Sequence, residues 1–300
     1  MLRPLLLVIM LLFAAGCLGT PAPEESSYAV DEDGHLTLAA PPPDAAVTVL
    51  EEQGCVTVSS VIFRNGNGTD VHALLAEPDR PGMAIVFAPG AGVPAEAHRE
   101  RAVRYAEAGI AFLVVDIRGN GGETPGEPFN LDMDYHRFAG GEWPQYYRIV
   151  ADLSGARQVL AGRTGVPVVA MGSSNGGRYA AVAAATDPGF AGYIGISTSG
   201  FGRAGDGYTG DARRFLLSID PDACVARITP RSVTIFHAEG DPIIPYADGQ
   251  ALFDHAGEPK ECIAFNGTHG ICSEVDDSVI AESAQFYAPV NETYGSLKSW

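Results

Sequence analysis

Short apolar runs alternate with longer amphipathic or small-residue segments along most of the chain, and this alternation predicts the order of its strands and helices. The apolar runs are rich in β-branched residues and end at Gly, Pro or polar residues, as is typical of buried strands. These runs span Met83–Ala88, residues 110–115, residues 166–171, Tyr193–Thr198, Ser232–His237 and Glu261–Phe265. The helices that we expect between them cover Ala95–Ala108, Gln145–Ala161, Arg178–Ala185 and Asp211–Ser218. Strands and helices in this order favour a mainly parallel α/β sheet that is flanked by helices.

Two earlier runs, Cys55–Arg64 and Thr69–Glu77, flank the turn-forming residues Asn65–Gly68 and predict an antiparallel hairpin ahead of the parallel strands. The expected sheet therefore has eight strands, mostly parallel, with an antiparallel start. We expect no large cap, because the stretch Ser199–Arg231 has room for one helix but not for a further domain. The stretch Gly122–Pro144 is rich in Gly, Pro and aromatic residues and is expected to be irregular.

The start of the chain is typical of an export signal. A short basic start precedes the apolar run Leu5–Ala15, which is too short for a comfortable membrane span. Small residues and then Cys17 follow, and this arrangement resembles the lipobox of bacterial and archaeal lipoproteins. We therefore expect residues 1–17 to be a signal peptide with lipidation at Cys17; an ordinary cleaved signal or a short uncleaved anchor are the alternatives. Residues 18–46 are Pro-rich and acidic and predict a tether, which leaves residues 47–300 as the folded domain.

Charge and cysteine content restrict the partners of this domain. The formal net charge of −18 argues against binding to nucleic acid or to anionic lipid, so we expect membrane attachment through a lipid on Cys17. The other cysteines are even in number, which in an exported domain favours two disulfides, and the sequence does not choose the pairing. These cysteines are Cys55, Cys224, Cys262 and Cys272. The spacing of Cys and His matches no zinc site, and we expect neither a metal nor a cofactor.

The segment Gly172–Gly177 fits the pattern G-x-S-x-G, with Ser174 in the position of a nucleophile. A β-branched strand leads into this segment and a small-residue helix leads out, which is the context that the motif requires. The sharp turn strains the Ser backbone, so that its hydroxyl projects clear of the sheet. Ser173 is the local rival, but it fails the spacing of the motif, and the role of a plain helix N-cap is the structural alternative for Ser174.

Two further residues complete a constellation for nucleophilic catalysis. A Ser hydroxyl is a poor nucleophile at neutral pH and needs a base, and the base needs a carboxylate that orients it. His269 follows the last predicted strand, and Asp241 follows the strand before it. The carboxyl ends of parallel strands meet at one edge of a sheet, so we expect the three side chains to meet there. Asp206 is the alternative acid, and we interpret His237 as structural because it lies within its strand.

In this order, Ser174, Asp241 and His269 resemble the catalytic residues of the α/β-hydrolase family. The paired glycines after Ser174 and the run Gly240–Pro245 are similar to dienelactone-hydrolase-like and prolyl-oligopeptidase-like enzymes, over roughly residues 55–290. The resemblance implies an oxyanion hole made by two backbone N–H groups. One is that of Asn175, which follows the nucleophile, and the other is that of Ala91. Relatives usually carry His-Gly just before the second donor, where this chain has Pro-Gly.

These patterns together predict an exported serine hydrolase, similar to carboxylesterases, which cleaves small carboxylic esters through an acyl-enzyme on Ser174. A prolyl-oligopeptidase-like peptidase is the alternative, as is a surface lipoprotein that keeps the fold and binds without catalysis. The expected location is outside the cytoplasm, either anchored at a membrane or secreted. The sequence does not indicate an oligomeric state, an acyl chain length or a leaving group.

Overall fold

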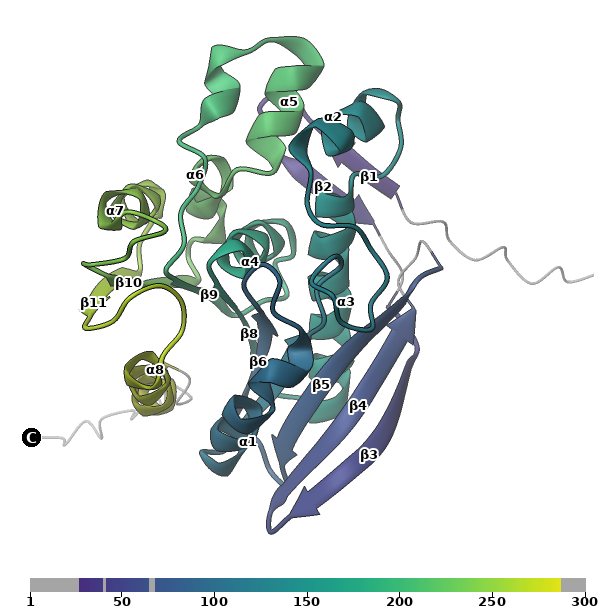
Figure 1. Cartoon of the computed structure of the whole chain (residues 1–300), viewed down its shortest axis with the longest axis vertical. Coiled ribbons are helices and arrows are strands. Elements are labelled where there is room, and N and C mark those ends of the chain that lie inside the picture. The colour runs from purple at the N-terminus through teal and green to yellow at the C-terminus, as the bar shows by residue number, and fades with distance from the viewer. Residues whose placement is uncertain (1–26, 40–41, 65–67, 287–300) are drawn as a thin grey trace, which may run out of the picture.

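The computed structural model describes residues 27–39, 42–64 and 68–286. Its main sheet has nine strands in the order β11-β10-β9-β8-β6-β7-β5-β4-β3 (Figure 1). These strands are β3 (Ala45–Gln53), β4 (Val56–Arg64), β5 (Asp70–Pro78), β6 (Met83–Ala88), β7 (Ile110–Val115), β8 (Val168–Ser173), β9 (Gly192–Ile196), β10 (Ser232–Ala238) and β11 (Lys260–Phe265). Neighbouring strands from β6 to β11 are paired in parallel. The antiparallel pairs are β3 with β4, β4 with β5, and β5 with β7. The predicted mostly parallel sheet with an antiparallel start is therefore confirmed.

The sheet has one strand more than the eight expected. The extra strand is β3, an edge strand whose side chains are mostly exposed, so the sequence carries no alternation of apolar and polar positions there. Backbone pairing with β4, interrupted by a register shift between Val49 and Glu51, holds it in place. An edge strand of this kind depends on its neighbour and leaves little trace in the hydrophobic pattern.

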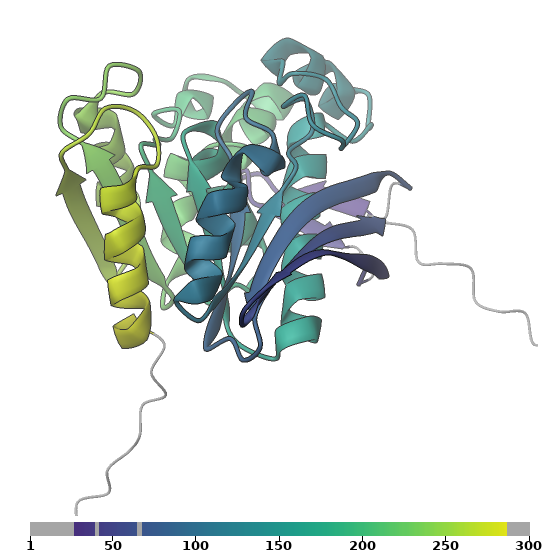
Figure 2. The ribbon, with the colours of Figure 1, turned by 60° about the horizontal axis from the view of Figure 1, so that its bottom comes forward.

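Helices cover both faces of the sheet and bury two separate apolar cores. They are α1 (Arg99–Glu107), α2 (Leu131–Ala139), α3 (Gln145–Thr164), α4 (Asn175–Thr186), α5 (Gly210–Ser218), α6 (Pro221–Cys224), α7 (Tyr246–His255) and α8 (Ser273–Phe286), with short 3-10 turns η1 (Ala95–His98), η2 (Ala204–Gly207) and η3 (Val225–Ile228). Helices α1 and α8 pack against one face, as Figure 2 shows, and α3, α4 and α7 pack against the other. None of the helices in the described ranges is long and apolar enough to cross a bilayer.

Within the part of the chain that the structure describes, no cap domain stands over the sheet. The connection from β9 to β10 carries η2, α5, α6 and η3, all of them short. The stretch Gly122–Pro144, expected to be irregular, contains α2, which packs beside α5. The N-cap of α2 is Asn130, whose side chain accepts a hydrogen bond from the Met133 N–H at 3.0 Å. The Gly and Pro residues around α2 obscure its first turn in the sequence, and the N-cap Asn130 is the local feature that indicates where the helix begins.

Residues 27–39 differ from the tether that we expected over residues 18–46. They form two antiparallel strands, β1 (Ser27–Val30) and β2 (Leu36–Ala39), which pack on the domain beside α2, α3 and α5 (Figure 1). Val30 and Leu36 are buried, and the ring of Tyr28 lies 5.0 Å from that of Tyr147 and 5.3 Å from that of Trp143. These apolar side chains let the segment fold back, whereas its Pro and acidic content alone indicates an extended chain. The predicted signal peptide and Cys17 lie outside the described residues.

The order of the strands places a switch point in the middle of the sheet. The chain runs from β6 to β7 on one side and later returns to β8 on the other side of β6. In open parallel sheets a crevice forms outside the carboxyl ends of the strands at such a point. The loop after β6 and the turn after β8 flank this crevice, and both carry residues that the sequence singled out.

Candidate functional site

Ser174 lies in the turn between β8 and α4, in a backbone conformation that few side chains adopt. Its φ is 54° and its ψ is −124°, which is a strained combination for a residue with a Cβ. Neighbouring residues hold this conformation from two sides. The Ser174 N–H donates to the Ile196 carbonyl at 2.8 Å, and the Thr198 hydroxyl donates to the Ser174 carbonyl at 2.8 Å. Strand β9 and the residues that follow it therefore hold Ser174 in its strained conformation.

Glycines on both sides of Ser174 let the backbones come very close together. A Cβ on Gly172 would lie 2.3 Å from the Gly176 carbonyl oxygen, and a Cβ on Gly176 would lie 2.0 Å from the Ala88 carbonyl oxygen. Neither approach is compatible with a side chain at these positions. The start of α4 thus packs directly onto the end of β6, which fixes the nucleophile candidate relative to the loop after β6.

Asp241 lies in the turn after β10, and its side chain is fully buried. Its Oδ1 accepts hydrogen bonds from the N–H groups of Ile243 at 2.9 Å and Ile244 at 3.0 Å. Burial acts to raise the pKa of Asp241, but these backbone donors and the His269 ring together outweigh it, so the pKa lies below its ordinary value. The carboxyl group is therefore an anion at neutral pH and accepts hydrogen bonds.

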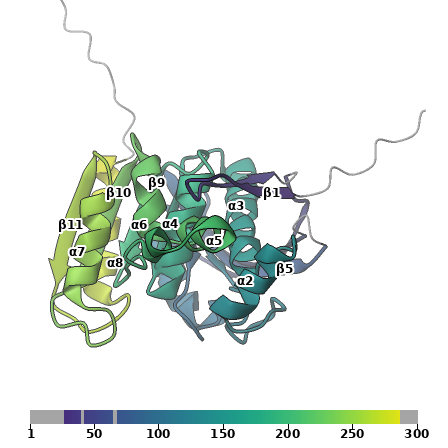
Figure 3. The same ribbon diagram turned by 90° about the horizontal axis from the view of Figure 1, so that it is seen from above.

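His269 joins the other two side chains. Its Nε2 lies 2.8 Å from the Ser174 Oγ, and its Nδ1 lies 2.9 Å and 3.0 Å from the two carboxylate oxygens of Asp241. Strands β10 and β11 run side by side in parallel, with Ala238 opposite Phe265, so the loops that carry Asp241 and His269 begin at the same level (Figure 3). The structure thus brings together the three residues that the sequence singled out.

The expected oxyanion donors lie beside Ser174. Asn175 is the first residue of α4, and a Cβ on Gly90 would lie 3.4 Å from the Ser174 Cβ, which places the loop after β6 against the nucleophile candidate. Within the described residues, the N–H groups of Asn175 and Ala91 donate to no acceptor. Two unused N–H groups next to a nucleophile are what stabilisation of a developing oxyanion requires.

The side chain of Asn120 holds the loop that carries Ala91. Its Nδ2 donates to the Gly90 carbonyl at 2.9 Å and to the Val93 carbonyl at 3.1 Å, and its Oδ1 accepts from the Gly92 N–H at 3.1 Å. These three hydrogen bonds fix the loop on both sides of Ala91. The sequence does not indicate this role, because Asn120 stands in an ordinary Gly-rich turn and its partners are distant in sequence.

Two alternatives from the sequence take no part in this constellation. Asp206 forms ion pairs with Arg203 and Arg213 at the surface, at 2.8 Å and 3.6 Å, so Asp241 is the acid that reaches the histidine. Ser173 is the last residue of β8 and is buried. It therefore lies within the sheet below the turn.

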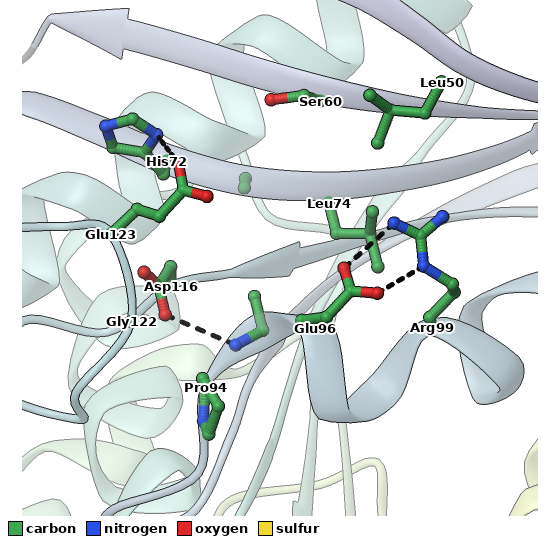
Figure 4. A pocket seen from close by; sticks show the side chains of 12 residues that line it. Leu50, Ser60, His72, Leu74, Pro94, Glu96, Arg99, Asp116, Gly122 and Glu123 are labelled. Atoms are coloured by element: carbon green, nitrogen blue, oxygen red, sulfur yellow. Dashed lines mark hydrogen bonds and ion pairs between the residues drawn. The ribbon is translucent and has the colours of Figure 1, made fainter.

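A cavity of about 250 Å³ lies between strands β3–β5 and the η1–α1 segment (Figure 4). Its lining includes Leu74, the ion pair of His72 with Glu123 at 2.9 Å, and the ion pair of Glu96 with Arg99 at 2.5 Å. None of the three residues of the constellation lines it. We therefore place the site at the switch point of the sheet and not in this cavity.

The two expected disulfides are absent, because all four cysteines of the described residues are free thiols. Cys55 is exposed, and Cys224 is buried in the core beneath α4. Cys262 lies on β11 with its Sγ 4.0 Å from the Gln250 Oε1 of α7, whereas Cys272 packs against the core on the opposite face. The sheet therefore separates Cys262 from Cys272. Whether two cysteines can form a disulfide depends on their positions in the fold, which an even number of cysteines does not reveal.

No group of three or more His, Cys, Asp or Glu side chains in the described ranges is arranged to hold a metal ion. The buried ion pair of Arg118 with Asp152, at 2.5 Å, and the bonds of Asp116 to the N–H groups of Ala95 and Thr124 hold the turn after β7. Asp116 and Arg118 therefore have a structural role.

No family model and no curated protein sequence matches this chain. Solved structures do match it in fold. An acetyl xylan esterase from Paenibacillus sp. R4 is 18% identical, with a TM-score of 0.68, and the match covers 82% of this chain and 90% of that chain. Acetyl xylan esterase 1 from Thermoanaerobacterium sp. JW/SL YS485 is 17% identical, with a TM-score of 0.67, covering 82% and 89% of the two chains.

A cold-adapted esterase from an Arctic intertidal metagenomic library is 16% identical, with a TM-score of 0.58, and the match covers 79% of this chain and 97% of that chain. At these low sequence identities, the likeness concerns the fold alone. The parallel sheet, the strained turn at Ser174 and the solved structures agree, and the chain has the α/β-hydrolase fold.

Proposed function

We propose that this protein is a serine hydrolase that cleaves carboxylic esters through an acyl-enzyme on Ser174. The observation that carries the proposal is the position of His269, whose two ring nitrogens lie within hydrogen-bond distance of the Ser174 hydroxyl and the Asp241 carboxylate. This arrangement supplies a nucleophile, a base and a group that orients the base. The esterases that share the fold support an ester as the substrate.

In the proposed first step, the Ser174 hydroxyl transfers its proton to His269 Nε2 while its Oγ attacks the acyl carbon. The carbonyl oxygen of the substrate takes the negative charge and accepts hydrogen bonds from the N–H groups of Asn175 and Ala91. Asp241 accepts the Nδ1–H bond of His269, which holds the other nitrogen toward Ser174 and stabilises the imidazolium.

The alcohol then leaves with the proton of His269, and the acyl group remains on Ser174. In the second half of the reaction, His269 removes a proton from water, whose oxygen attacks the acyl carbon. Collapse of this intermediate returns the proton to Ser174 and releases the carboxylic acid. The unused N–H groups of Asn175 and Ala91 serve both half-reactions.

We further propose that the enzyme acts outside the cytoplasm, anchored by a lipid on Cys17 or, failing that, secreted. The support is the sequence pattern of residues 1–17, which resembles a lipoprotein signal. Metabolic labelling with a radioactive or clickable fatty acid, beside a Cys17→Ala variant, would test the anchor. Label that persists in the variant would contradict lipidation at this residue.

The activity is tested with p-nitrophenyl esters of increasing acyl length, beside a Ser174→Ala variant. We expect hydrolysis by the wild type and its loss in the variant, and the length profile measures the size of the acyl site. Hydrolysis that persists in Ser174→Ala would refute Ser174 as nucleophile. Hydrolysis of peptide substrates but not of esters would favour the peptidase alternative, and no reaction with a fluorophosphonate probe would favour a binding protein.

A further inference from the structure

His237 lies beside the acid of the constellation and takes no part in the chemistry described above. It is the sixth residue of β10, and its side chain is fully buried. Its Nε2 lies 2.9 Å from the Ile244 carbonyl oxygen and 3.6 Å from the Asp241 Oδ2. A buried imidazole at this distance from a catalytic carboxylate is in a position to control where that carboxylate points.

The surroundings of His237 determine its tautomer. A carbonyl oxygen accepts and never donates, so the hydrogen bond to Ile244 requires the proton on Nε2. Nδ1 is buried, and within the described residues no group donates to it or accepts from it. A Cβ on Gly249 of α7 would lie 2.1 Å from this Nδ1, so α7 packs tightly against that side of the ring. The ring therefore directs its Nε2–H toward the turn.

Hydrogen bonds around Ile244 close a ring that includes the acid. The Ile244 N–H donates to the Asp241 Oδ1 at 3.0 Å, and the Ile244 carbonyl accepts from His237. The His237 Nε2 also lies 3.6 Å from the second oxygen of Asp241, which is beyond hydrogen-bond distance. His237 thus holds the turn through the Ile244 carbonyl, and the Ile244 N–H passes this hold on to the Asp241 carboxylate.

We propose that His237 is a positioning residue for Asp241, holding the turn so that both carboxylate oxygens stay on His269. The inference rests on the proposed serine hydrolase mechanism, in which the carboxylate must orient the base. Without the His237 N–H, the Ile244 carbonyl is left buried without its donor and the turn relaxes. His269 then spends part of its time away from Ser174, which lowers the rate of the chemical steps and leaves substrate binding unchanged.

The test compares amides that reproduce one ring nitrogen or the other. In His237→Gln the amide N–H2 reaches the position of Nε2, whereas in His237→Asn it reaches only the position of Nδ1. We measure kcat and KM with p-nitrophenyl acetate, corrected for the active sites titrated by a fluorophosphonate. Thr234→Val is the matched control, because it removes a buried polar group from the same strand.

We expect His237→Asn to lower kcat by about tenfold, or ~1.4 kcal/mol, at unchanged KM, and His237→Gln to restore most of it. Thr234→Val should leave kcat within about twofold of the wild type. An equal loss of kcat in the two amide variants, or an unchanged kcat in His237→Asn, would show that His237 contributes only packing and does not position Asp241. Correction for titrated sites separates these results from a loss of folded protein.

A second readout does not need turnover. The proton between His269 Nδ1 and Asp241 gives a low-field resonance in the proton NMR spectrum. We expect this resonance to weaken or shift in His237→Asn and to persist in His237→Gln. If the wild type hydrolyses no ester, the proposed function fails while this measurement still decides the positioning role. An unaltered resonance in His237→Asn would overturn the inference.

Discussion

Replacement of Asn120 by Ala tests whether the loop after β6 supplies an oxyanion donor. The side chain makes three hydrogen bonds to this loop, at 2.9 Å, 3.1 Å and 3.1 Å, on both sides of Ala91. The substitution removes all three and leaves Ser174, His269 and Asp241 in place, because none of them contacts Asn120 in the described structure. An effect on activity would therefore pass through the loop that carries the Ala91 N–H.

The size of the effect follows from two limits. Complete loss of one oxyanion donor costs about 3 kcal/mol of transition-state stabilisation. A loop that has lost three neutral hydrogen bonds, each worth about 1 kcal/mol, still visits the productive position for part of the time. We therefore expect kcat/KM of Asn120→Ala to fall by about 10- to 100-fold, which is ~1.4 to ~2.7 kcal/mol.

The assay is steady-state hydrolysis of p-nitrophenyl acetate, with thermal unfolding to confirm that the variant is folded. Asn120→Asp is the informative companion, because it keeps an acceptor for the Gly92 N–H but loses both donors to carbonyl oxygens. We expect it to be at least as slow as Asn120→Ala. A folded Asn120→Ala enzyme with the kcat/KM of the wild type would show that the loop needs no clamp or that Ala91 donates nothing.

Three further outcomes follow from the structure. Asp241→Asn should lower kcat by about 10³- to 10⁴-fold in the same assay, because an amide no longer selects the tautomer of His269; a loss below tenfold would contradict the assigned acid. Burial and the nearby Arg101 lower the pKa of His98 from 6.5 to about 4. At a pH between these two values, His98 binds a proton in the unfolded chain but not in the folded chain. Stability should accordingly fall as the pH drops from about 6.5 towards 4, and urea unfolding should show a smaller fall in His98→Leu; equal pH dependence in both proteins would refute this. Dithiothreitol should leave the melting temperature unchanged, since the described cysteines are free thiols; a large drop would reveal a disulfide.

Local patterns predicted the parts of the fold that neighbouring residues determine. The strands at the centre of the sheet are buried on both faces, so their apolar runs are continuous and easy to recognise. Ser174 and Asp241 each stand just past such a run, and His269 stands just past the partly buried edge strand β11. Parallel strands bring their carboxyl ends to one edge, which is why three residues far apart in sequence could be expected to meet.

The features that the sequence did not predict depend on contacts with distant residues. Strand β3 has few buried side chains, and the pair β1 and β2 folds back through Tyr28 and Leu36 onto helices that come more than a hundred residues later. Asn120 acts through backbone groups of another loop. The free cysteines illustrate the same limit, because pairing depends on which face of the sheet each thiol occupies.

The edge position of β11 has a consequence for how activity is lost. This strand is the last in the sheet, its side chains are only partly buried, and His269 follows it by a few residues. Edge elements with little buried surface open in subglobal fluctuations that cost less free energy than complete unfolding. Opening of β11 would withdraw the histidine while the central strands remain paired. In mild denaturant we therefore expect inactivation before the core unfolds, with amide hydrogen exchange in β11 rising in step with the loss of turnover.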